Sequence, residues 1–498
     1  MPLTRRQLLV AGIGAGVAGL GACTPSTGHD AHAPSRSFGP PSAAPTSAGQ
    51  RVVERSLTAA PVTWDLAGRA VQTWGYAARV PGPLVRATAG DLVRVTLDNQ
   101  LPADTTIHWH GIRLRNAADG VPGLTQDPVR PGGRFVYEFT APDPGTYFFH
   151  PHVGLQLDRG LYAPMVIDDP REPGRYDHEW IVVLDDWLDG TGRTPDDVLA
   201  TLIADGGGAS TGPMGGMGGM GHDMGGMGHD GMGPPPWGHG GDVAYPLFLI
   251  NGRPPADPEV LAAKPGQRVR LRIVNAASDT IFTVALGGHR LTVTHTDGFP
   301  TAPTEVDAAY LGMGERYDAV VTLGDGVFPL VARPFGKTEG GQALALVRTG
   351  AGQAPGPDVT PAELSGQVLI GSQLQPGPGS TLPVKEPDAT VQLTLQGSMK
   401  PYRWGINGAP HGHNTPLTVK AGQRLRIMAL NMTMMTHPLH VHGHTFALRS
   451  GLRKDTVLMA PMQSMALDLD ADNVGDWMVH CHNAYHGEAG MMITLTYV

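Results

Sequence analysis

The sequence predicts an all-β protein made of three related sandwich domains, and three observations support this class. Only 16% of the 498 residues are charged, whereas 69 are glycine and 45 are proline. Short β-type runs separated by turns with Gly and Pro fill the chain from residue 51, as is typical of a sandwich, and long amphipathic stretches are absent. One such run also recurs three times.

The recurring run consists of a turn with glycine, an alternating strand and a closing asparagine. Its three copies span residues 89–99, 265–275 and 421–431. Each copy is preceded by a similar short element, at residues 81–83, 251–253 and 407–409. Copies so far apart do not form a solenoid, so they predict three related domains.

Composition divides the chain into consecutive regions. We expect a signal at 1–23, a flexible tether at 24–50, domain one at 51–172, domain two at 173–350, a linker at 351–388 and domain three at 389–498. Domain two contains an insert at 205–242 that is rich in Met, Gly and His. The insert is either a collector of cuprous ion, which thioether sulfur selects, or a disordered linker.

The N-terminal residues predict export. Arg5 and Arg6 precede an apolar run that is too short to span a bilayer comfortably, and the pattern resembles a twin-arginine signal. Cys23 then ends a lipobox-like sequence. We therefore expect a lipid anchor on Cys23 at the outer face of the cytoplasmic membrane, in the cell envelope. The alternative is a chance cysteine after a signal that is cleaved elsewhere.

Charge and cysteine content narrow the function. The net charge is −9 and no basic cluster follows the N-terminus, so nucleic acid is not an expected partner. Cys23 and Cys481 are the two cysteines. If Cys481 binds a metal, no disulfide stabilises the fold.

The stretch from His480 to Met491 carries the ligand types of an electron-transfer copper. Cys481 offers a thiolate, His486 an imidazole and Met491 a weak axial thioether. Residues 476–479 look like a strand, so His480 and His482 should face away from Cys481, toward a second site. An electron at Cys481 would reach that site along the backbone. The alternative is a buried free cysteine packed among core histidines.

Four His-x-His pairs provide imidazoles for this second site, because the spacing places both rings on one face of an extended segment. Domains one and three each contribute two pairs: His108/His110, His150/His152, His440/His442 and His480/His482. Eight imidazoles suffice for three coppers in a pocket between these domains. Further histidines are interpreted as loop residues (His411, His413), a supporting residue (His444) and structural residues (His289, His295).

In these motifs and their order, residues 51–498 resemble the three-domain multicopper oxidases, in particular the actinobacterial, mycobacterial-type exported copper oxidases. The resemblance implies three cupredoxin-like Greek-key β-sandwich domains and four copper ions. It implies a type 1 copper held by His437, Cys481 and His486, with Met491 axial. The type 2 copper would be held by His108 and His440, and the two type 3 coppers by His110, His150 and His482 and by His152, His442 and His480.

The resemblance also implies that single electrons enter at the type 1 copper and that the three-copper site reduces dioxygen to water. Asp119 occupies the place of an acid near the family's cluster and is a candidate proton relay; the alternative is an ordinary Asp-Gly turn. Glu488 is a second candidate. The family often has a glutamate directly after the second type 1 histidine, where this chain has Gly487.

The methionines before His437 indicate the reductant. Met432, Met434 and Met435 place soft sulfur beside the type 1 ligands, which favours cuprous ion, oxidised in copper defence. These methionines are alternatively core residues. The competing functions are a laccase acting on small phenols and a copper-binding protein without turnover, and the complete ligand set argues against the latter. We expect a monomer, because one chain completes the cluster.

Overall fold

The computed structural model describes residues 49–172, 175–204 and 238–498. Strands dominate these residues, so the all-β class is confirmed. The predicted signal, nearly all of the tether and insert residues 205–237 lie outside them. In the described ranges no helix combines the length and apolarity needed to cross a bilayer.

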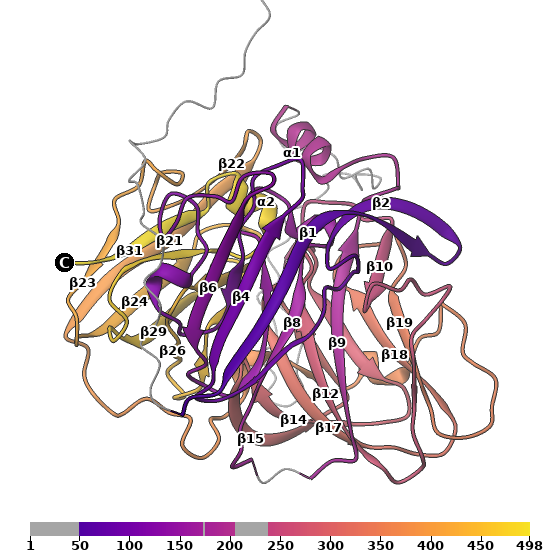
Figure 1. Ribbon diagram of the computed structural model, residues 1–498. Coiled ribbons are helices and arrows are strands. Elements are labelled where there is room, and N and C mark those ends of the chain that lie inside the picture. The colour runs from indigo at the N-terminus through magenta and orange to yellow at the C-terminus, as the bar shows by residue number, and fades with distance from the viewer. Residues whose placement is uncertain (1–48, 173–174, 205–237) are drawn as a thin grey trace, which may run out of the picture. The chain divides into compact units, whose positions relative to one another are not determined.

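Domain one contains two four-stranded sheets. The first has the order β2-β1-β4-β6, and Figure 1 shows β4 between β1 and β6. Its strands are β1 (Val52–Leu66), β2 (Arg69–Tyr76), β4 (Leu92–Asn99) and β6 (Arg134–Thr140). The second sheet has the order β3-β8-β7-β5. Its strands are β3 (Val85–Thr88), β5 (His108–His110), β7 (Gly145–His150) and β8 (Ala163–Asp168).

Domain two contains two six-stranded sheets, in the orders β10-β9-β12-β17-β14-β15 and β11-β19-β18-β13-β16-β20. The first is built from β9 (His178–Trp187), β10 (Leu247–Ile250), β12 (Arg268–Asn275), β14 (Leu291–Thr296), β15 (Phe299–Val306) and β17 (Arg316–Thr322). The second is built from β11 (Val260–Ala262), β13 (Phe282–Leu286), β16 (Ala308–Leu311), β18 (Val327–Pro334), β19 (Ala343–Arg348) and β20 (Val368–Leu369). Helix α1 (Pro195–Ala204) follows β9.

Domain three contains sheets in the orders β22-β21-β24-β29-β26-β27 and β23-β31-β30-β25-β28. The first is built from β21 (Ala389–Met399), β22 (Tyr402–Ile406), β24 (Arg424–Asn431), β26 (Phe446–Ala447), β27 (Arg453–Lys454) and β29 (Ser464–Asp470). The second is built from β23 (Leu417–Val419), β25 (His437–Val441), β28 (Thr456–Met459), β30 (Asp476–Cys481) and β31 (Met492–Tyr497). The short helix α2 (Ala484–Glu488) follows β30.

The three domains repeat one strand arrangement, as the recurring run predicts. The repeated strand is β4, β12 or β24, and it pairs in parallel with β1, β9 or β21 respectively. On its other side it pairs antiparallel with β6, β17 or β29. The recurring sequence therefore marks the same central strand in each domain.

The closing asparagine of each copy is buried and holds the loop that follows its strand. Asn275 donates from Nδ2 to the carbonyls of Thr280 and Leu311, at 2.9 Å each, and its Oδ1 accepts from the amide of Ala277. Asn99 and Asn431 make the equivalent bonds. Because backbone groups in a buried loop need partners, one side chain fixes the whole connection.

Replacing Asn275 with alanine tests this role in the domain that contributes no proposed copper ligand. The change leaves two buried carbonyls and one amide without their partner, so the free energy of unfolding should fall by about 3 kcal/mol. Urea unfolding followed by circular dichroism measures it. The control is Gln353→Ala on the exposed surface, which should stay within about 0.5 kcal/mol. Equal effects of the two changes would disprove the role.

The predicted linker has structure of its own. It contains the short 3-10 helices η3 (Ala362–Ser365) and η4 (Gly371–Gln373), and its strand β20 pairs in parallel with β16. Residues 351–388 therefore pack along domain two on their way to domain three. The sequence did not predict this packing, because a two-residue strand among glycines and prolines produces no hydrophobic periodicity.

One continuous hydrophobic core connects the three domains. The cluster includes Trp109 of domain one, Phe248 of domain two and Trp477 of domain three, all almost completely buried. Side chains at the domain junctions are therefore held by packing from several sides.

Candidate metal centres

The first group of metal-type donors lies in domain three and consists of His437, Cys481 and His486; we call it the thiolate site. His437 begins β25, Cys481 ends β30 and His486 lies in α2. The Cys481 sulfur is 3.4 Å from Nδ1 of His437 and 3.6 Å from Nδ1 of His486, and these two nitrogens are 3.0 Å apart. Asn483 caps α2 by accepting from the amide of His486, which sets the position of that ring.

The outer nitrogens of both rings have partners. His486 donates from Nε2 to Asp242 at 2.9 Å, and Nε2 of His437 hydrogen-bonds the Thr433 hydroxyl at 2.7 Å. The bond to Asp242 occupies Nε2 of His486, so Nδ1 is the nitrogen that faces the thiol and is placed to bind a metal. A histidine fixed in this way through its other nitrogen is typical of metal ligation.

Met491 is the predicted fourth donor of this site. It is fully buried, its amide donates to the carbonyl of His486, and its carbonyl accepts from the amide of Cys481. The backbone of Met491 is thus bonded directly to both residues. One thiolate, two imidazoles and one thioether fit a blue copper.

Asp242 is a functional candidate that sequence reasoning missed, because it ends the low-complexity insert. Its carboxylate contacts His486 and also accepts from the Tyr402 hydroxyl at 2.7 Å. Burial alone would raise the pKa of Asp242, but His486 and Tyr402 hold it below the usual value. Burial likewise opposes protonation of His486, yet Asp242 and Cys481 raise the pKa of His486 to about 10. Domain two therefore places a negative charge at the thiolate site.

The sequence also did not indicate that Trp404 lies at the thiolate site. Its buried indole ring lies 4.1 Å from the ring of His486 and 5.4 Å from that of His437. It forms an apolar wall that keeps water from both imidazoles. A lone tryptophan on a strand carries no sequence signal that distinguishes this role from ordinary core packing.

The second group consists of all eight histidines of the four predicted pairs; we call it the imidazole cluster. His108 of domain one stacks on His442 of domain three at 3.7 Å, and His110 stacks on His440 at 3.8 Å. Three sets bring their donor atoms within 4.8 Å of one another. They are His108, His110 and His440; His110, His150 and His482; and His152, His442 and His480.

Burial disfavours the charged form of seven imidazoles of the cluster. Burial is the main cause that lowers the pKa of six of them well below the usual value: His110, His150, His152, His440, His442 and His482. It also lowers the pKa of His480 to about 4. Neutral rings keep a lone pair for a metal ion.

Hydrogen bonds show which nitrogens hold those lone pairs. His442 donates from Nδ1 to Asp119, and His480 donates from Nδ1 to the carbonyl of Cys481. Their Nε2 atoms, both without a proton, then face each other at 3.0 Å. In the described part of the chain, Nε2 of His108 and of His440 have no partner although they are buried. Such an arrangement is costly unless a cation lies between the rings, so the residues fit metal ions.

Asp119 joins the two domains at the cluster. Its Oδ2 accepts from His442 at 2.9 Å, and its own carbonyl accepts from Nδ1 of His108 at 3.0 Å. Gly120 follows at a φ of 81°, and a Cβ there would collide with the carbonyl oxygen of Ile107. The Asp-Gly turn therefore places the carboxylate of Asp119 beside the cluster. The turn and a role at the cluster are compatible interpretations of Asp119.

Cys481 connects the two groups. It belongs to the thiolate site, whereas its neighbours His480 and His482 belong to the imidazole cluster. This is the alternation that a strand imposes. The hydrogen bond from His480 to the carbonyl of Cys481, at 2.9 Å, adds a second link to the covalent one.

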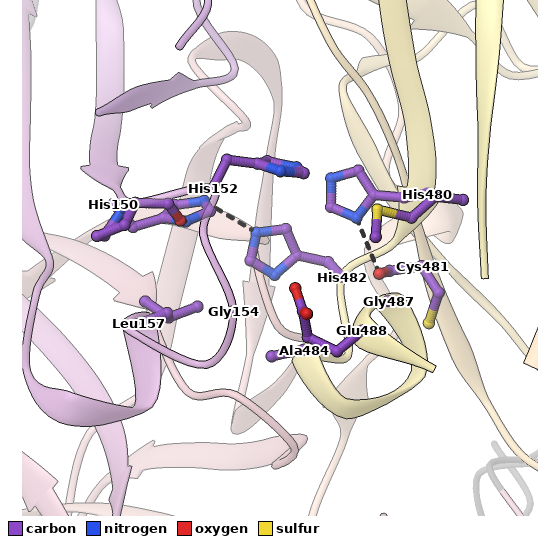
Figure 2. A pocket seen from close by; sticks show the side chains of 12 residues that line it. His150, His152, Gly154, Leu157, His480, Cys481, His482, Ala484, Gly487 and Glu488 are labelled. Atoms are coloured by element: carbon purple, nitrogen blue, oxygen red, sulfur yellow. Dashed lines mark hydrogen bonds between the residues drawn. The ribbon is translucent and has the colours of Figure 1, made fainter. Parts of the chain in front are cut away.

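A small cavity that opens to solvent reaches the imidazole cluster, and its lining includes His150, His152, His480 and His482. Figure 2 shows these rings together with the carboxylate of Glu488, which points into the cavity. Glu488 is exposed on its outer side. Desolvation by the surrounding protein, with a contribution from Asp196, raises the pKa of Glu488 to about 7.

Domain two supports the cluster through a buried ion pair. Arg316 binds both carboxylate oxygens of Asp455, at 2.7 and 2.6 Å, and both side chains are fully buried. The Asp455 carboxylate lies 3.3 Å from Nε2 of His110, and its backbone carbonyl accepts from His440 at 2.9 Å. Arg316 and Asp455 are 139 residues apart, so sequence inspection did not pair them.

The three methionines before His437 differ in burial. Met435 is 5% exposed, and its backbone bridges to Gly238 and His239. Met432 and Met434 are 51% and 67% exposed. The core interpretation therefore suits Met435, whereas the other two thioethers are open to solvent.

Five further histidines in the described part of the chain lie outside both groups. His411 and His413 are exposed in the loop between β22 and β23. His444 hydrogen-bonds the carbonyl of His442 and the hydroxyl of Tyr497. His289 bonds backbone groups of Gly287 and Gly324, and His295 contacts Thr294.

Comparison with known proteins gives consistent matches. Domain profiles described as multicopper oxidase match residues 58–172, 238–352 and 384–498. The chain is 46% identical to Multicopper oxidase MmcO of Mycobacterium tuberculosis, over 99% of this chain and 97% of that protein. It is 28% identical to a Copper resistance protein A homolog of Pseudomonas syringae pv. tomato, over 88% and 91%. A solved multi-copper oxidase from Pseudomonas thermotolerans superposes with a TM-score of 0.66 at 28% identity, over 90% of this chain and 100% of that one.

Proposed function

Since the chain belongs to the multicopper oxidase family of copper-dependent oxidoreductases with dioxygen as acceptor, we propose that it oxidises cuprous to cupric ion while dioxygen is reduced to water. The observation that carries the choice of cuprous ion is the pair of exposed thioethers, Met432 and Met434, in the segment that leads to His437. We further propose export by the twin-arginine-type signal, a lipid anchor at Cys23 and a monomeric state.

We assign four coppers to the two groups. His437, Cys481 and His486 would hold the type 1 ion, together with Met491. His108 and His440 would hold the type 2 ion. One type 3 ion would take His110, His150 and His482, and the other His152, His442 and His480. When bound, the coppers supply one-electron uptake at the thiolate site and four-electron reduction of dioxygen at the cluster. The donor atoms grouped within 4.8 Å support this assignment.

The protein's own residues connect these two chemistries. The backbone of Cys481 and the hydrogen bond from His480 carry electrons from the thiolate site to the cluster. Asp119 holds His108 and His442 in place and is the proposed inner proton relay. Glu488 lines the cavity and is the proposed outer one.

Cuprous ion suits the surface at the thiolate site for two reasons. Exposed thioethers bind soft cations, and Met432 and Met434 are the exposed methionines nearest in sequence to His437. The negative charge of Asp242 beside His486 also attracts a cation more strongly than a neutral phenol. Domain two thus supplies the acid at the thiolate site, where the partner of His437 is the uncharged hydroxyl of Thr433.

The double change Met432→Leu with Met434→Leu tests the reductant. Leucine keeps the apolar volume but removes the sulfur, so the KM for cuprous ion should rise about tenfold relative to the KM for a small phenol. Oxygen uptake with each reductant measures both constants. If the ratio of the two KM values stays unchanged, the thioethers do not bind the reductant and cuprous oxidation is contradicted. If the KM for the phenol rises more, the protein is a laccase.

Asp242→Asn is expected to slow cuprous oxidation by about tenfold. The amide keeps the size of the side chain but removes the charge that holds His486 and attracts the ion, so the dependence of the rate on salt should also flatten. Initial rates at low and high ionic strength measure both effects. Glu54→Gln, an exposed carboxylate of domain one, is the control and should change neither. If Asp242→Asn keeps the rate and its salt dependence, the carboxylate has no part in substrate attraction.

A further inference from the structure

One exposed histidine lies beside the cavity that reaches the imidazole cluster. The amide of His411 donates to the carbonyl of Gly490 at 2.9 Å, and its imidazole hydrogen-bonds the backbone of Met492. Asn414 holds the loop at the same residue, because its Nδ2 donates to the carbonyl of Met492 at 2.7 Å. The loop between β22 and β23 is therefore attached to the start of β31.

Met492 connects this loop to the cluster. It lines the cavity together with His480 and Glu488, the latter two seen in Figure 2. Met492 and His480 are direct partners in the β30–β31 ladder, and side chains of directly opposed residues lie on the same face. An imidazole, a thioether and a cluster imidazole thus follow one another from the surface inward.

The donor types indicate what binds there. Thioether sulfur and neutral imidazole together suit cuprous ion. Burial is the main effect on the His411 ring and lowers the pKa of His411, which favours the neutral form that can bind a metal, although part of the side chain reaches solvent. Most of the cluster is buried, since His480 is 6% and His482 3% exposed, and His152 is its one partly exposed ring. A copper ion that enters the cluster from solvent therefore has to pass from one set of ligands to the next.

We propose that His411 and Met492 form a transient cuprous site at the cavity, through which copper reaches the imidazole cluster as the apo-protein is loaded. The site acts in assembly and takes no part in turnover. The inference rests on the cluster histidines being copper ligands, and it is independent of which reductant the enzyme uses.

The test is the rate of copper loading into the full-length apo-protein. Cuprous ion stabilised in acetonitrile buffer is added without oxygen, and bound copper per chain is followed by mass spectrometry. His411→Ala and Met492→Leu should each slow loading about tenfold, the low end of what losing one supporting interaction costs in metal affinity. Both variants should end at the same number of coppers as the unchanged protein, and His411→Met, which restores a soft donor, should recover much of the rate.

His413→Ala is the matched control, because His413 is exposed in the same loop and two residues away. It should load at the unchanged rate. The proposal is overturned if His411→Ala loads normally, if His413→Ala is equally slow, or if His411→Ala ends with fewer coppers. Failure of cuprous turnover in fully loaded protein would instead refute the proposed reductant, so the two outcomes are separable.

Discussion

Replacing Cys481 with serine is expected to abolish oxygen uptake while leaving the imidazole cluster able to bind copper. The Cys481 sulfur lies 3.4 and 3.6 Å from the two nitrogens of the thiolate site, and a hydroxyl oxygen is a poor substitute for a soft thiolate. Without that thiolate, electrons from the reductant have no path to His480 and His482. Uptake should fall to the uncatalysed rate with cuprous ion and with a phenol.

Two further measurements distinguish this outcome from misfolding. The variant should bind three coppers in place of four and should lose the intense blue thiolate-to-copper absorption. The same substitution at Cys23, the other of the two cysteines, should change neither quantity. Continued oxygen uptake by Cys481→Ser, or loss of every copper, would contradict the separation into a thiolate site and an imidazole cluster.

Replacing Arg316 with leucine should have the largest effect on stability. The change leaves the fully buried carboxylate of Asp455 without its bidentate partner, and breaking a buried ion pair on one side costs about 3–5 kcal/mol. Because Asp455 also contacts His110 and His440, the cluster should bind copper more weakly. Urea unfolding and copper titration of the same preparation measure both effects.

The control for Arg316 is an ion pair at the surface. Arg253 pairs with Asp257, and both side chains are more than a third exposed, so Arg253→Leu should cost no more than about 1 kcal/mol. If Arg316→Leu costs no more than this control, domain two does not support the cluster through Asp455.

Much of the fold followed from patterns local in sequence. The recurring run identified β4, β12 and β24, because a turn, an alternating strand and a closing asparagine are all determined within about eleven residues. The His-x-His spacing and the position of Cys481 likewise predicted which rings share a face, since alternation in a strand needs no tertiary information.

Contacts between residues far apart in the chain could not be predicted from the sequence. Asp242 follows a low-complexity stretch, and nothing in its neighbours indicates that its carboxylate meets His486, 244 residues later. The pair of Arg316 and Asp455 escaped prediction for the same reason. Burial was also undecided for Met435 and Met432, which lie three positions apart, because a short loop has no periodicity that distinguishes an inward from an outward side chain.

The most direct test of the account is the number of cuprous ions oxidised for each dioxygen consumed by copper-loaded protein. An oxygen electrode and a cuprous-specific dye measure the two quantities together. If electrons pass through Cys481 to a cluster that reduces dioxygen completely, the ratio should be about four, because forming two waters takes four electrons. No hydrogen peroxide should accumulate. A ratio of about two with peroxide accumulating, or copper binding without any oxygen uptake, would contradict it.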